Sequence, residues 1–281
     1  MAIMPRREPL FAHSGIPDCS RPIVTHLDGH PEIPGIHGTG FFVRKGEEVF
    51  FVTARHCLLK DDQDDASAIA NVLHVPYSLD LVNPSERDYV RFNSICSFLH
   101  SSPDIPGRFM DIVALQPIVK RGSWQDKRLR SIAAKLPPTG EWLDQTATAI
   151  RSKHPILKNG KVWMVAAGFP QAGTSTEVRF AETSPGIVSA TEIRTQRVVI
   201  AGLLQEGVYP HTMSVADVTW NQNLNGFSGS PVFARYKDDN GIQYALAGML
   251  ITGGNRLAHF IRINQILEAI SELTGLLNRP S

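Results

Sequence analysis

The sequence has few cysteines, almost no net charge and no long apolar run. Three cysteines in 281 residues cannot form a disulfide framework, because an odd number leaves at least one thiol unpaired. A formal charge of +1 creates no field that would attract nucleic acid or an anionic membrane. No stretch is apolar over the length of a bilayer, and the first nine residues lack the pattern of a signal peptide. We therefore expect a cytoplasmic protein that binds neither nucleic acid nor membrane.

A real hydrophobic core is expected, since 42% of the residues are hydrophobic. Many short apolar runs alternate with turn signals, which favours antiparallel strands over βαβ units. Residues 40–44 and 49–53, for example, read as a hairpin. Helical spacing predicts a C-terminal helix, with Asn264 as its cap. The apolar residues that recur at this spacing are Ile263, Ile266, Leu267, Ile270, Leu273 and Leu277.

The predicted organisation has four parts. Two polar segments with helical spacing, 124–135 and 141–153, interrupt the strand signals and are interpreted as a helical connection between two β units. The parts are an N-terminal arm (1–20), a first β-barrel (21–120), the helical connection (121–160) and a second β-barrel with the C-terminal helix (161–281).

Three local patterns carry the chemistry. Ser228 lies between glycines in Gly226-Phe227-Ser228-Gly229-Ser230-Pro231, a turn that can project a hydroxyl and aim backbone N–H groups beside it. A serine needs a base to act as a nucleophile, and His56 follows the apolar strand 49–53. Asp111 opens the apolar strand 111–115 and can orient that base, whereas its rival Asp104 lies in a turn context. A lone histidine is most often an ordinary surface or core residue, but the residues flanking His56 weigh against that reading.

These patterns resemble the chymotrypsin-like serine peptidases, especially their bacterial trypsin-like and V8-like branch. Thr53-Ala54-Arg55-His56-Cys57 is similar to the segment that carries the base, and the chain order His56, Asp111, Ser228 is that of the family. The resemblance implies an all-β fold of two antiparallel six-stranded barrels. It also implies a serine endopeptidase that acts on protein or peptide through a Ser-His-Asp triad, without a metal or other cofactor.

The resemblance also implies how a substrate would be held. The oxyanion hole would be formed by the backbone N–H groups of Gly226 and Ser228. Gln222 would lie at the floor of the primary specificity pocket, and an edge strand would pair with the substrate backbone. No charged side chain is expected there, so we predict an uncharged residue before the cut; the pocket-wall candidates are Leu250, Ile251, Thr252 and Gly253.

The chain also departs from the family. Phe227 stands where zymogen-activated members carry an aspartate, and because phenylalanine has no charge, we expect no activation by an ion pair with a new N-terminus. Cys57 has no partner cysteine on the strand 38–43, so we expect a reduced, buried thiol. Residues 121–158 exceed the minimal fold and are either decoration or a surface for a regulatory protein.

Other functions remain open at this point. His26, His30 and His37 suggest a metal only weakly, because the glycines and prolines around them disfavour a shared helical face. Cys19, Cys57 and Cys96 lack the paired spacing of a zinc site. A pseudo-peptidase that binds extended peptides, or a protease that is latent until a partner activates it, are the alternatives to an active endopeptidase.

Overall fold

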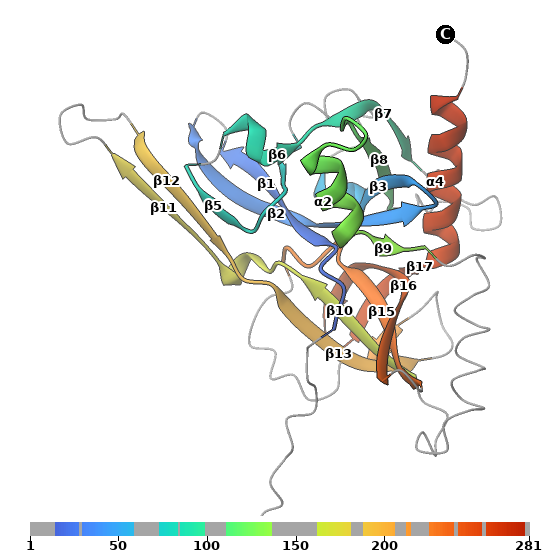
Figure 1. Ribbon diagram of the computed structural model, residues 1–281. Coiled ribbons are helices and arrows are strands. Elements are labelled where there is room, and N and C mark those ends of the chain that lie inside the picture. Colours follow the sequence, from blue (N-terminus) through green and yellow to red (C-terminus); the bar gives the residue numbers. More distant parts are fainter. Residues whose placement is uncertain are drawn as a thin grey trace, which may run out of the picture.

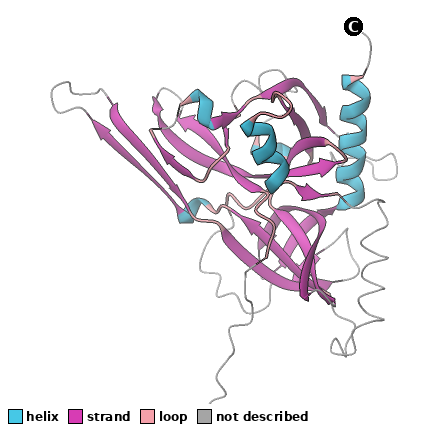
Figure 2. Cartoon of the chain, in the orientation of Figure 1, coloured by secondary structure: helices cyan, strands magenta, loops and turns pink. Residues whose placement is uncertain are grey.

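Strands dominate the computed structural model (Figure 2). The structure describes residues 15–27, 30–58, 73–83, 85–98, 111–136, 162–180, 188–205, 212–214, 225–238, 241–254 and 257–278. The all-β fold class expected from the sequence is confirmed.

The first sheet has six strands in the order β1-β2-β3-β8-β7, with β9 added to β2. Its strands are β1 (Ser20–Leu27), β2 (His30–Lys45), β3 (Glu48–Thr53), β7 (Phe92–Phe98), β8 (Val113–Pro117) and β9 (Ala134–Lys135). The predicted hairpin is formed by β2 and β3, with Gly46 at φ +61° in its turn. The sheet differs from the expected closed antiparallel barrel, since β9 runs parallel to β2 and the described strands leave the sheet open.

The second sheet is a closed six-stranded barrel, as predicted, in the order β10-β13-β14-β17-β16-β15. Every pair in it is antiparallel. Figure 1 shows this barrel stacked against the first sheet. Its strands are β10 (Trp163–Gly168), β13 (Val198–Gln205), β14 (Thr212–Ser214), β15 (Pro231–Asp238), β16 (Gly241–Gly254) and β17 (Leu257–Arg262).

Smaller elements flank the two main sheets. A three-stranded sheet combines β11 (Thr174–Phe180), β12 (Val188–Thr195) and β5 (Asp80–Val82), and its β11–β12 hairpin projects from the body in Figure 1. The short strands β4 (Val75–Pro76) and β6 (Tyr89–Val90) pair with each other. Three single-turn 3₁₀ helices are η1 (Arg55–Cys57), η2 (Glu86–Asp88) and η3 (Gln171–Gly173).

The helix α2 (Trp124–Ile132) begins the segment expected to be helical. The Ser123 hydroxyl accepts a hydrogen bond from the Asp126 N–H (3.2 Å) and caps its first turn. The helix ends three residues earlier than predicted, because Ala134 and Lys135 pair with β2 instead. The second predicted helical segment, 141–153, lies outside the described residues, and the boundaries between the four parts stay predictions.

The C-terminal helix α4 (Ile263–Leu277) has the predicted amphipathic spacing and buries Ile263, Ile266, Ala269, Ile270 and Leu273. It contacts β16 and β17 of the barrel and also β7 and β8 of the first sheet, so it joins the two units. The predicted cap was wrong: the capping position is Arg262, and Asn264 lies inside the first turn. Neither helix in the described ranges is long and apolar enough to cross a membrane.

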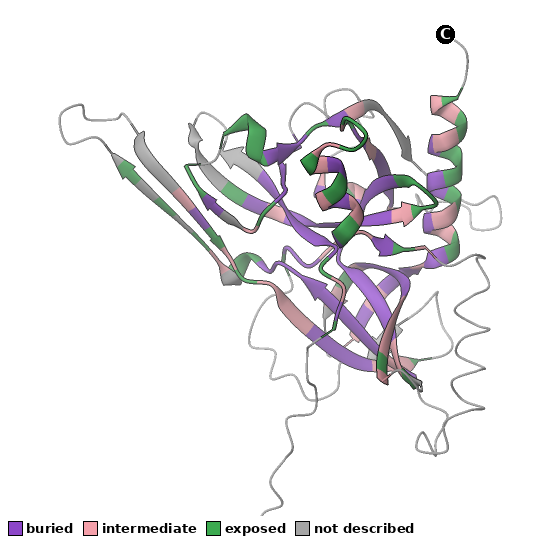
Figure 3. Cartoon of the chain, in the orientation of Figure 1, coloured by how far each residue is buried: buried purple, intermediate pink, exposed green. Residues whose placement is uncertain are grey.

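The hydrophobic core is one cluster of buried side chains that come from the first sheet, from the barrel and from the region between them (Figure 3). The described end of the predicted arm is docked on this core. Cys19 is completely buried, and its carbonyl accepts a hydrogen bond from the Phe42 N–H (2.9 Å). Residues 15–20 of the predicted arm are therefore attached to the core, while residues 1–14 lie outside the described part.

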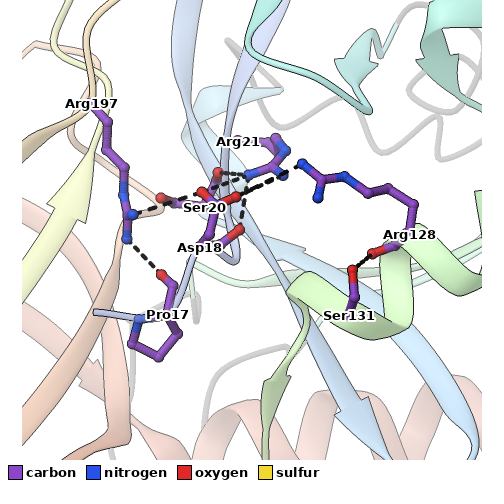
Figure 4. Close-up of polar contacts among 7 residues, drawn as sticks. All are labelled: Pro17, Asp18, Ser20, Arg21, Arg128, Ser131 and Arg197. Atoms are coloured by element: carbon purple, nitrogen blue, oxygen red, sulfur yellow. Dashed lines mark hydrogen bonds and ion pairs between the residues drawn. The ribbon is translucent and has the colours of Figure 1, made fainter. Parts of the chain in front are cut away.

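Asp18 ties three elements together (Figure 4). Its carboxylate lies 3.3 Å from the buried Arg21 of β1, 3.7 Å from Arg197 before β13 and 4.0 Å from Arg128 of α2. Arg197 also donates to the Pro17 carbonyl (2.6 Å). One carboxylate thus contacts the first sheet, the connecting helix and the approach to the second barrel.

Candidate active site

His56 is held at the end of β3 by a tight turn. After Thr53 the chain passes into η1, whose Cys57 side chain is 3% exposed and packs against β2. A Cβ atom built on Gly38 would come within 2.6 Å of the Cys57 sulfur, so only glycine fits opposite this thiol. Cys57 is a free, buried thiol, as predicted.

Asp111 reaches His56 because β8, which follows it, pairs with β3. The Oδ2 atom of Asp111 lies 2.5 Å from Nδ1 of His56, and its Oδ1 atom accepts the backbone N–H of His56 (2.9 Å). The Arg55 N–H donates to the Asp111 carbonyl (3.3 Å). One carboxylate therefore fixes both the ring and the backbone of the histidine. The rival Asp104 lies outside the described residues.

The electrostatics of this pair favour a charged imidazole. The pKa of His56 is raised from 6.5 to about 10, and the largest cause is the hydrogen bond that its Nδ1–H donates to the Asp111 carboxylate; partial burial opposes this rise. The His56 side chain is 49% exposed, so its other ring edge is accessible from solvent.

The serine turn needs glycine at two positions. Gly226 has φ +89° and Gly229 has φ +85°, a left-handed region that side chains rarely adopt. A Cβ on Gly229 would overlap the Thr39 carbonyl oxygen, and one on Gly226 would lie 2.7 Å from the Phe169 carbonyl oxygen. The turn is therefore pressed directly onto the backbone of β2 and of the segment after β10.

The Ser228 hydroxyl donates to the Ile251 carbonyl (2.9 Å). No hydrogen bond joins it to His56 within the described part of the chain, but both residues line one cleft of about 260 Å³. The cleft is lined by His37, His56, Cys57, Gln171, Asn225, Gly226, Ser228, Leu250, Thr252 and Gly253.

Two N–H groups of this turn are left without an acceptor among the described residues: those of Gly226 and Ser228. The carbonyls of the same two peptide units are occupied. That of Asn225 accepts the Gln171 N–H (2.9 Å), and that of Phe227 accepts the N–H (3.0 Å) and the hydroxyl (2.5 Å) of Ser230. Because a trans peptide directs its N–H opposite to its C=O, these anchors determine where both N–H groups point.

The predicted pocket wall is only partly assembled from described residues. Leu250, Thr252 and Gly253 line the cleft, and Ile251 reaches it through the carbonyl that Ser228 contacts. Leu250 is buried and Thr252 is exposed. Gln222, the predicted pocket floor, lies outside the described residues.

Sequence reasoning missed Thr39, Gln171 and Asn225, which contact or border the serine turn. Asn225 adjoins the serine motif, so it could have been found by extending that motif, and Gln171 directly follows Gly168-Phe169-Pro170 at the end of β10. Thr39 gives no such signal, because a threonine between two glycines of a strand has nothing that marks it as part of a site. Within the described ranges, no group of three potential metal ligands comes together.

The sequence matches no family model and no curated protein. Solved structures do match the fold. The match to a mutant of human heparin binding protein (CAP37) covers 94% of this chain and 93% of the heparin binding protein chain, with 14% identity and a TM-score of 0.52. It also matches the protease Anisep from Arthrobacter nicotinovorans (11% identity, TM-score 0.48) and the thermostable serine protease AL20 from an extremophilic microorganism (12%, 0.49). Each of these two matches covers 92% of this chain and 97% of the matched protease chain. At such identities the likeness concerns architecture alone: over nine-tenths of its length, the chain has the chymotrypsin-like fold of the serine proteases.

Proposed function

We propose that the protein is a serine endopeptidase in which Ser228 is the nucleophile, His56 the general base and Asp111 the residue that orients the base. The observation that carries this proposal is the meeting of the three motifs: Asp111 bonds Nδ1 of His56, and His56 and Ser228 share one cleft. Similarity of fold alone would not support a peptidase activity, since one of the matched proteins is named for heparin binding.

The proposed reaction proceeds through an acyl-enzyme. The Ser228 oxygen attacks the peptide carbonyl while its proton passes to Nε2 of His56, and Asp111 stabilises the resulting imidazolium. The N–H groups of Gly226 and Ser228, which have no acceptor in the described chain, would bind the oxyanion. His56 then protonates the leaving amine. A water molecule releases the acyl group by the same steps, and the proton returns to Ser228.

Reaching the first step requires two local changes. His56 must lose its proton, because a charged imidazole cannot accept another, and the raised pKa of His56 places this loss above the ordinary histidine range. The Ser228 hydroxyl must also turn from the Ile251 carbonyl toward Nε2 of His56.

The substrate we propose is an extended peptide with an uncharged residue before the cut. The described cleft walls on the Ile251 side present Leu250, Thr252 and Gly253, none of which pairs with a charge. The segment 251–253 would bind the peptide backbone as an added strand.

Labelling with an alkyl fluorophosphonate tests the proposed chemistry without knowledge of the substrate. The Ser228 oxygen would displace fluoride at phosphorus, and mass spectrometry would locate the adduct. We expect one adduct, on Ser228, in the full chain. We expect none in Ser228→Ala, and strongly slowed labelling in His56→Ala. Labelling of Ser228→Ala as fast as the parent would refute the proposal.

A latent protease is the second candidate, and the Ser228–Ile251 hydrogen bond favours it. In this form the hydroxyl would stay turned away from His56 until a partner binds. The surface proposed for that partner lies within 121–158, where α2 exposes Trp124 at 63%. Slow labelling that rises when a partner is added would support latency, whereas fast labelling of the isolated chain would exclude it. Peptide binding with no labelling would instead indicate a pseudo-peptidase.

A cytoplasmic location stays a prediction.

A further inference from the structure

Thr39 of β2 lies between the strand that leads to His56 and the turn that carries Ser228. It is completely buried. Its neighbour Gly40 pairs with Thr53, three residues before the proposed base. On its other side lies Gly229, which leaves no space for a Cβ atom against the Thr39 carbonyl.

Four hydrogen bonds converge on this residue. Its backbone N–H donates to the Ser228 carbonyl (3.0 Å), and its hydroxyl donates to the Gly226 carbonyl (2.7 Å). The same hydroxyl accepts the Phe169 N–H (2.9 Å), and its carbonyl accepts the Thr53 hydroxyl (2.8 Å). Thr39 therefore contacts the serine turn at two carbonyls and joins it to both β3 and the end of β10.

These two carbonyls bracket the proposed oxyanion hole. The hole would use the N–H groups of Gly226 and Ser228, and the carbonyl of Gly226 belongs to the peptide unit between them. A hydrogen bond to the Gly226 carbonyl fixes the rotation of the Gly226–Phe227 peptide unit. It thereby also fixes the angle between the N–H groups of Gly226 and Ser228, which lie in the units on either side. The carbonyl of Ser228 fixes the unit that follows.

We infer that Thr39 is a positioning residue that sets the oxyanion hole from the strand of the base, through its hydroxyl. This inference rests on the proposed function. Thr39 reaches none of the atoms that would react, so its effect would come through the turn. A buried hydroxyl that both donates and accepts cannot be replaced by an apolar group without leaving the Gly226 carbonyl and the Phe169 N–H unpaired, and the turn would rearrange to relieve this.

The test compares three variants of the full chain. Thr39→Val keeps the shape and removes the hydroxyl, Thr39→Ser keeps the hydroxyl, and Thr274→Val is the matched control. Thr274 donates a similar hydroxyl hydrogen bond (2.8 Å), but to the Ile270 carbonyl inside α4. The readouts are the second-order rate constant of fluorophosphonate labelling at Ser228, and kcat and KM on a fluorogenic peptide selected from a library.

We expect Thr39→Val to lower the labelling rate and kcat by roughly 10- to 100-fold, less than the loss of an oxyanion donor itself. KM should change by less than about threefold, since a misplaced N–H group weakens the transition state more than the bound peptide. Thr39→Ser should recover most of the rate, and Thr274→Val should match the parent. A merely structural role would lower the amount of folded protein without this split between kcat and KM.

Parent-like labelling and kcat in a folded Thr39→Val would overturn the inference and leave the serine-peptidase proposal intact. Absence of labelling in the parent would instead refute the proposed function. Should Thr39→Val not fold by circular dichroism, Thr39→Ala removes the same hydroxyl without a branched side chain and is read in the same way. A Thr39→Ser variant as slow as Thr39→Val would also contradict the inference, because it would show that the hydroxyl is not the determinant.

Discussion

Replacing Asp111 with asparagine tests the electrostatics of the proposed site most directly. The carboxylate makes two contacts with His56: Oδ1 accepts the backbone N–H and Oδ2 lies against Nδ1. An asparagine oxygen can keep the first contact, but its NH₂ group then faces Nδ1 and favours the tautomer with the proton on Nε2. That tautomer cannot take the Ser228 proton. By analogy with the Ser-His-Asp template, kcat should fall by about 10⁴, or roughly 5.5 kcal/mol of transition-state stabilisation.

The same variant should also shift the pH profile. The base acts only when neutral, so activity rises with pH through the pKa of His56. Asp111 raises that pKa, so the parent should gain activity above pH 6.5, and Asp111→Asn should reach half of its own maximum at a lower pH. The measurement is kcat/KM on one peptide from pH 5 to 10, with circular dichroism as the fold control. Asp104→Asn is the matched carboxylate control and should behave like the parent. A kcat within tenfold of the parent, or an unshifted profile, would refute the role given to Asp111.

Three further predictions concern the nucleophile, the turn and specificity. Ser228→Ala and His56→Ala should each lower kcat by several orders of magnitude, and the double variant should lose little more because the two residues act as a unit; turnover assays check this. Gly229→Ala should lower the free energy of unfolding in urea by about 1–3 kcal/mol more than Gly46→Ala. Both glycines have positive φ, but only Gly229 faces a backbone oxygen, so equal losses would contradict the packing argument. A peptide library should give uncharged residues before the cut, and a strict preference for Arg, Lys, Asp or Glu would show that the pocket is wrongly assigned.

The elements that sequence reasoning placed well are those with local signals. The β2–β3 hairpin has two apolar strands around a polar turn, and α4 has an apolar repeat at helical spacing. The same reasoning failed where a distant partner decides. Ala134 and Lys135 continue a helical pattern, but pairing with β2 makes them a strand, and β12 pairs with β5 from a part of the chain more than a hundred residues earlier. Neither pairing has a periodic pattern that identifies the partner strand.

The residues of the candidate site likewise include some that the local sequence identifies and one that only a distant contact reveals. His56, Asp111 and Ser228 stand out because each lies in a short segment whose composition requires its conformation, such as glycines around a turn with φ above +80°. Thr39 holds that turn, yet it lies 187 residues from Gly226, and its own segment reads as an ordinary strand. Replacing the Thr39 hydroxyl would leave all three segments unchanged while removing the contact that, on our inference, orients the oxyanion donors. The presence of the three segments in a chain of this fold is therefore insufficient evidence for activity unless the residue opposite the serine turn can also hold its carbonyls.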